Sequence, residues 1–218
     1  MFRLIAFIGF IVIICGIVLH HLLFPCGYKK RFAPTTLVRK KVHLFTLLFP
    51  EQSRTWPSRL RKLAFVVAVF SFMVLLLTGF GPVLLGGRLH GWLLMIHATF
   101  APVLIACAAF IAITGAVQYT FSSKDKKFIP SPVCQRPTFS EGCWLTDSGI
   151  GAKTCFWTLL VLSLPVTLSI VVSMLPLIGT EGQAFLFQVH RWSALVFGWI
   201  AIIELYILIR MEIRKEFE

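Results

Sequence analysis

The chain contains five apolar stretches, each long enough to cross a lipid bilayer as a helix. Spanning the hydrocarbon core takes about 20 predominantly apolar residues. Five segments meet this length, at about residues 2–24, 63–86, 92–118, 155–178 and 185–209. Only 14% of all residues are charged, whereas an average soluble domain carries about 25%. We therefore expect an all-α membrane protein with five transmembrane helices.

The basic residues are distributed unevenly over the segments that connect these helices. Residues 25–62 hold ten of the 21 lysines and arginines, residues 119–153 hold five, and three follow Ile209. The opposite side keeps only Arg3, Arg88 and Arg191. Because cytoplasmic loops are enriched in Lys and Arg, we expect the N-terminus outside and the C-terminus inside. This topology accounts for the net charge of +12, with membrane lipid and no nucleic acid as a partner.

This topology divides the chain into two parts. Residues 1–62 comprise an N-terminal transmembrane helix and a basic segment in the cytoplasm. Within that segment, residues 38–49 are too short to span and are expected to lie along the inner membrane surface. Residues 63–218 comprise four further helices and a short cytoplasmic tail, and we expect these helices to form a bundle.

Two histidines interrupt the apolar helices at nearly the same depth on the expected outer side. His97 and His190 each lie about five or six residues inside a separate helix. Ionisable side chains within a membrane span usually mark a functional site, and imidazole is a standard protein ligand of haem iron. We therefore predict that His97 and His190 are the two axial ligands of one b-type haem.

Small and basic residues near these histidines fit the same prediction. Ala101 shares the face of His97, and Ala194 and Gly198 share the face of His190. These small side chains would leave room for a flat macrocycle, although small residues also allow close helix packing in membranes. Arg88 and Arg191 could pair with haem propionates, because guanidinium matches a carboxylate in geometry and charge. Alternatively, both arginines are interfacial anchors.

Further ionisable residues are expected to lie in the inner half of the membrane or at its inner surface. Glu204 follows His190 by fourteen residues, so it shares the histidine's face about 21 Å deeper. Its carboxyl could relay protons or contact a quinone, or it could form an interfacial ion pair with Arg210. His20, His21 and His43 lie by inference at the inner surface. They could ligate a second haem, or they could be solvated.

The chain resembles the cytochrome b subunit of formate dehydrogenase, a family shared with the nickel-hydrogenase-type and b561-like bacterial cytochromes. The resemblance covers about residues 60–209 and rests on four strings in helices two to five. These strings are LAFVVAVFSFMVLLLTG, GWLLMIHATFAP, GAKTCFW and FQVHRWSALVFGW. It implies a four-helix unit with an extra N-terminal helix.

The resemblance also implies where haems bind. In the family, the outer haem is held by the histidines that correspond to His97 and His190. The two ligands of an inner haem correspond to Phe65 and Glu204, neither of which is a histidine. We therefore expect one haem, with the alternative that an inner haem is held differently, through the first helix or His43.

Together these features predict an electron-transfer subunit in the bacterial cytoplasmic (inner) membrane. It would carry electrons between the quinone pool and a partner, either a periplasmic multihaem c cytochrome or an iron–sulfur subunit, within a hetero-oligomeric respiratory complex. The subunit itself would be non-catalytic. Two other classes stay open: a haem-free membrane anchor of a redox complex, and a small transporter. No internal repeat of the kind found in transporters is evident.

Overall fold

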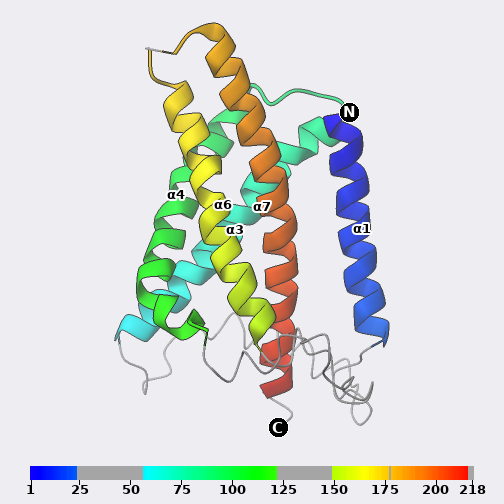
Figure 1. Ribbon diagram of the computed structural model, residues 1–218, viewed down its shortest axis with the longest axis vertical. Helices are drawn as coiled ribbons and strands as arrows, with labels where there is room; N and C mark the ends of the chain where they lie inside the picture. Colours follow the sequence, from blue (N-terminus) through cyan, green and yellow to red (C-terminus); the bar gives the residue numbers. More distant parts are fainter. Residues whose placement is uncertain (24–55, 122–148, 177, 216–218) are drawn as a thin grey trace, which may run out of the picture.

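The protein is all-helical throughout the part of the chain that the structure describes (Figure 1). The structure is a computed structural model. It describes residues 1–23, 56–121, 149–176 and 178–215, with side chains up to residue 211. The predicted surface segment at residues 38–49 lies outside these ranges.

Five long helices and one short 3-10 helix make up the described chain. They are α1 (Phe2–Leu23), α3 (Trp56–Leu84), α4 (Gly91–Gly115), η2 (Ala116–Tyr119), α6 (Ile150–Ser173) and α7 (Thr180–Lys215). All five predicted spans are therefore present, and each is long and apolar enough to cross a membrane.

The helix boundaries differ from the predicted ones where turn residues determine them. α6 begins and ends five residues earlier than expected. It follows Gly149, whose positive φ of 73° suits glycine. It ends before Leu175 and Pro176, because a residue that precedes proline disfavours the helical conformation. α3 begins seven residues earlier than expected, with Pro57 in its first turn, where proline is tolerated.

The surface of the helices is apolar, as a protein in lipid requires. Phe7, Leu77 and Ile113 expose 54%, 65% and 81% of their surface. Large contiguous apolar surfaces are rare on soluble monomers. With five membrane-length helices, the chain is a multi-pass membrane protein.

Four of the helices form two antiparallel hairpins. α3 packs along α4, and α6 packs along α7, whereas contacts between the hairpins are sparse. The turn between α3 and α4 is tight because Gly86 and Gly91 both adopt positive φ. The inner space between the two hairpins is lined by side chains of all four helices.

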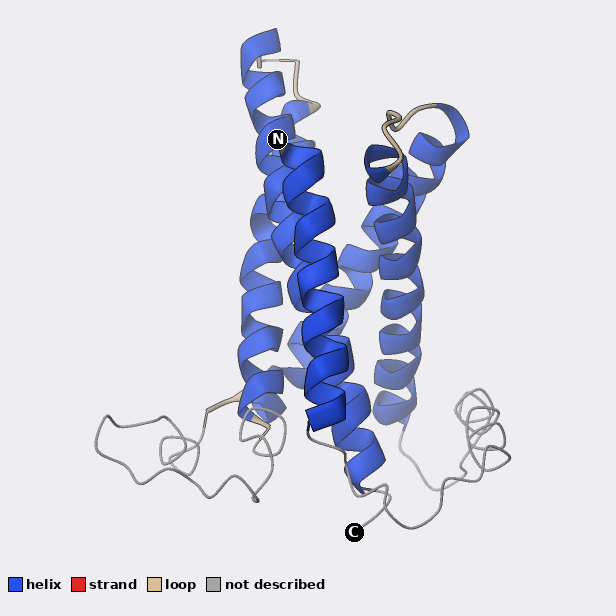
Figure 2. Ribbon diagram, turned by 90° about the vertical axis from the view of Figure 1, so that its right-hand side faces the viewer, coloured by secondary structure: helices blue, strands red, loops and turns tan. Residues whose placement is uncertain are grey.

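α1 lies against the outside of this four-helix arrangement (Figure 2). It approaches α7 closely at Gly9, where an added Cβ would clash with the Trp199 ring. Phe10 packs edge-on against Phe80 of α3 and Trp199, with ring centroids 5.3 and 6.4 Å apart. Ala6 is fully buried nearby. These contacts attach α1 to both hairpins at mid-membrane.

Polar contacts attach α1 at its two ends as well. At the N-terminal end, the Arg3 Nε donates to the Leu84 carbonyl at 3.0 Å, which satisfies one of the free carbonyls at the end of α3. At the other end, His20 Nδ1 lies 2.7 Å from the Tyr206 hydroxyl of α7. The N-terminal end of α1 and the C-terminal end of α7 lie at opposite ends of the bundle (Figure 1), as an odd number of spans requires.

Candidate functional site

His97 lies on α4 and faces α3. Its Nδ1 is 3.0 Å from the Thr78 hydroxyl oxygen. An added Cβ at Gly79 would lie only 3.1 Å from His97 Cε1, so the missing side chain of this glycine makes room for the imidazole. Thr78 itself is buried, with 7% of its surface exposed. The Thr78-Gly79 pair therefore forms a polar notch for His97 in an otherwise apolar helix.

The hydrogen bonds of Thr78 determine which imidazole nitrogen of His97 carries the proton. The Thr78 hydroxyl donates its single proton to the Val74 carbonyl at 2.7 Å. Its oxygen is then an acceptor for His97, so Nδ1 must be the protonated nitrogen. In neutral imidazole the other nitrogen, Nε2, carries a free lone pair.

His190 on α7 has the same pattern on the other hairpin. Its Nδ1 lies 2.9 Å from the Val166 carbonyl of α6. A carbonyl oxygen only accepts, so Nδ1 of His190 also carries the proton. Hence both histidines are fixed through Nδ1 by the neighbouring helix of their own hairpin, and in the neutral form each would present an unprotonated Nε2.

His97 and His190 lie on different hairpins, on α4 and α7. Among the described residues, no hydrogen bond engages Nε2 of either ring. Histidines that bind metals almost always donate the other ring N–H to a carbonyl or another acceptor, which fixes the tautomer and ring orientation. The arrangement can therefore supply two imidazole nitrogen ligands, one from each hairpin, and imidazole is a ligand type that haem iron takes.

The small residues predicted to flank a macrocycle have different surroundings. Gly198 is buried, and an added Cβ there would lie 3.6 Å from Leu76 of α3 and 3.9 Å from Phe10 of α1. These are ordinary van der Waals distances, so a small side chain could be accommodated at this position. Ala101 and Ala194 are both partly exposed, and each lies one turn inward of its histidine.

The two predicted propionate partners have different surroundings. The Arg191 guanidinium stacks over the Phe2 ring of α1 at 4.2 Å and lies 5.7 Å from the Phe187 ring. This geometry is a cation–π interaction at the end of the bundle. Arg88 is exposed in the turn between α3 and α4.

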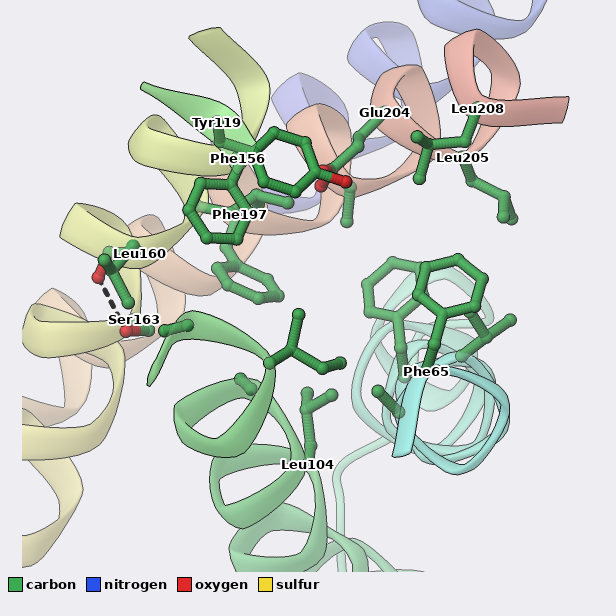
Figure 3. Close-up of a pocket in the computed structure, with 18 residues that line it drawn as sticks. Phe65, Leu104, Tyr119, Phe156, Leu160, Ser163, Phe197, Glu204, Leu205 and Leu208 are labelled. Carbon is green, nitrogen blue, oxygen red and sulfur yellow. Dashed lines mark hydrogen bonds between the residues drawn. The ribbon is translucent and has the colours of Figure 1, made fainter. Parts of the chain in front are cut away.

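Glu204 lines a cavity in the half of the bundle distant from His97 and His190 (Figure 3). Phe65 of α3 lines the same cavity, so the two positions singled out by the family resemblance face one space. Arg210 contacts the Tyr206 hydroxyl at 3.2 Å and forms no ion pair with Glu204 among the described side chains. Glu204 therefore belongs to the cavity rather than to an interfacial ion pair.

The predicted inner histidine cluster is not assembled within the described residues. His20 contacts Tyr206 and also lies 3.4 Å from the Arg210 guanidinium. His21, the next residue of α1, is exposed, and His43 lies outside the described residues. No group of three or more His, Cys, Asp or Glu side chains in the described ranges is arranged to hold a metal ion.

Comparisons with known proteins identify no relative. No family model, curated protein or solved structure matches this chain.

Three parts of the site were missed by the sequence analysis. Thr78 and Gly79 appeared only as the last two residues of a string that carries the family resemblance, and the Val166 carbonyl carries no sequence signal at all. The cavity was also missed, because its walls come from four helices whose facing sides the sequence does not specify. A threonine directly before a glycine in an apolar helix was the one available clue.

Proposed function

We propose that the protein is an electron-transfer subunit that binds one b-type haem between His97 and His190. The observation that supports this most strongly is the matched state of the two imidazoles. Each rests on the neighbouring helix of its own hairpin through Nδ1–H and leaves Nε2 available. When bound, the haem would supply one-electron redox chemistry.

The protein's own residues would determine the properties of that site. Thr78 and the Val166 carbonyl orient the imidazoles and, by accepting hydrogen bonds from them, increase their basicity as ligands. The surrounding apolar helices exclude water, which influences the redox potential. Arg88 and Arg191 are proposed as propionate partners; to reach a propionate, the Arg191 guanidinium would have to leave the Phe2 ring of α1.

The cellular role follows from the membrane setting and the charge distribution. We propose the bacterial inner membrane, with the haem near the outer face and the basic loops in the cytoplasm. Electrons would pass between the quinone pool and a periplasmic multihaem cytochrome c or an iron–sulfur subunit. We propose that Glu204 relays protons or contacts a quinone in the inner half of the membrane. The alternative function is a haem-free membrane anchor of a redox complex. In that case His97 and His190 would only pack and form hydrogen bonds within the same fold.

The absorption spectrum of the purified protein tests this proposal. The wild-type protein should show the Soret and alpha bands of a low-spin b-type cytochrome. His97→Ala and His190→Ala should each lose them, because each removes one axial ligand. His90→Ala is the matched control, since His90 is exposed in the outer turn and should retain the spectrum. A wild-type protein without these bands, or a normal spectrum in His190→Ala, would refute the proposal.

A further inference from the structure

The two histidines leave a cavity between the hairpins unexplained. It has a volume of about 160 Å³ and is lined by α3, α4, α6, η2 and α7. Its outermost wall on α4 is Leu104, seven residues after His97, which corresponds to about 10 Å along the helix. The cavity therefore begins directly inward of the imidazoles and continues toward Glu204.

The walls of the cavity are aromatic and apolar. Phe65 and Phe72 contribute from α3, Phe156 from α6 and Phe197 from α7. Tyr119 also lines the cavity and stacks on Phe156 with ring centroids 4.2 Å apart and planes 9° apart. Flat surfaces of this kind favour a planar aromatic or quinonoid ring, because ring pairs gain energy beyond the apolar area that they bury.

One acidic group faces this apolar space. Glu204 extends from α7 toward the Tyr119 and Phe156 rings (Figure 3). Of the other polar side chains in the lining, Ser163 already donates to the Leu160 carbonyl at 2.7 Å. A ligand in the cavity would thus meet a single carboxyl, which accepts a hydrogen bond when ionised and donates one when protonated.

The size of the cavity restricts the ligand. An engineered apolar protein cavity of about 150 Å³ holds one benzene molecule, so the space here matches a single six-membered ring and is too small for a porphyrin. We infer that the exit to the lipid lies beside Phe65, because Phe65 lines the cavity and exposes 39% of its surface on a membrane-length helix. A long apolar tail attached to the ring could leave beside Phe65.

We propose that this cavity binds the head group of a membrane-soluble, single-ring quinone or quinol. The ring packs among the phenylalanines, one ring oxygen forms a hydrogen bond with Glu204, and the isoprenoid tail passes Phe65 into the bilayer. This inference rests on the proposed electron-transfer function and assigns the site, the ring class and the recognition residue of its lipid-soluble partner. It also excludes a second haem from this space.

Direct binding to the full chain in lipid nanodiscs tests the inference. The probe is a radiolabelled benzoquinone with a ten-carbon tail, in quinone and quinol forms, corrected for partitioning into empty nanodiscs. Ala108→Leu fills the cavity, since Ala108 lines it. Ala109→Leu is the matched control, because Ala109 is exposed on the same helix. We expect Ala108→Leu to weaken binding about tenfold or more, a loss typical of a ligand that meets an occupied site, with no change in Ala109→Leu.

A second variant tests the carboxyl independently of the volume. Glu204→Gln keeps the shape but loses the charged acceptor, so quinol binding should weaken about tenfold while quinone binding changes less. The haem spectrum should remain normal in Ala108→Leu and Glu204→Gln.

Three results would overturn the inference. These are equal binding by the Ala108 and Ala109 variants, tighter binding of a bicyclic naphthoquinone probe than of the benzoquinone, or loss of the haem bands in Ala108→Leu. Ring binding that persists in a wild-type protein without haem would support the cavity assignment and refute only the electron-transfer function.

Discussion

Replacement of Thr78 by valine tests the tautomer argument on which the proposed haem site depends. Valine has the shape of threonine without the hydroxyl, so Thr78→Val removes the acceptor for His97 Nδ1–H and changes little else. An unsatisfied buried donor costs about 1–3 kcal/mol. Loss of an outer-shell partner typically weakens metal binding about 10–100-fold, which corresponds to about 1.4–2.8 kcal/mol. The two estimates agree, so we expect haem to bind Thr78→Val about 10–100-fold more weakly.

The matched control for this change is Thr99→Val. Thr99 donates to the Met95 carbonyl at 2.8 Å, the same intrahelical bond that Thr78 makes to Val74, but it is exposed and contacts no imidazole. Thr78→Ser retains the hydroxyl and should restore most of the affinity. The rate of haem transfer from detergent-solubilised protein to an excess of apomyoglobin measures the effect. Equal rates for wild type and Thr78→Val, or equal acceleration in Thr99→Val, would refute the reasoning.

Three further predictions concern haem number and the attachment of α1. A pyridine haemochrome assay should give about one haem per chain, because the ring-sized cavity cannot hold a second; a value near two would contradict this. Gly9→Leu should destabilise the protein by about 1–3 kcal/mol through overpacking, seen as a lower melting temperature. Gly16→Leu should be neutral, since nothing lies within 4 Å of an added Cβ there. Tyr206→Phe removes the hydroxyl that contacts His20 and should cost about 1–3 kcal/mol; an unchanged melting temperature would count against this bond.

The number of membrane helices was predictable because length and apolar character are properties of single segments. All five spans occur where the sequence indicated them. The boundary errors at α6 have local causes. A glycine with positive φ precedes the helix, and Pro176 prevents its continuation, so attention to these two residues would have corrected the limits. The long extension of α7 to Lys215 passes a polar stretch that carries no helix-breaking residue.

Contacts between helices were harder to predict from the sequence than the helices themselves. The small residues beyond His190 were expected to leave space for a macrocycle, and the sequence did not indicate that Leu76 and Phe10 are the neighbours of Gly198. Helical periodicity places residues on a common face but does not say which neighbour that face meets. The same limit hid Thr78 as the partner of His97, because it lies nineteen residues away on another helix.

α7 links the proposed haem site, the cavity and α1 in one rigid element. It carries His190 in its N-terminal half and Glu204 in its C-terminal half, and Glu204 lines the cavity between the hairpins. Its other side is held by α1, through Trp199 against Gly9 and through Tyr206 against His20. Because sparse contacts connect the two hairpins directly, α1 gives α7 support that the bundle itself does not provide. We therefore expect that loosening α1 would disturb the haem spectrum and the ring-binding cavity together, although α1 supplies no residue to either proposed site.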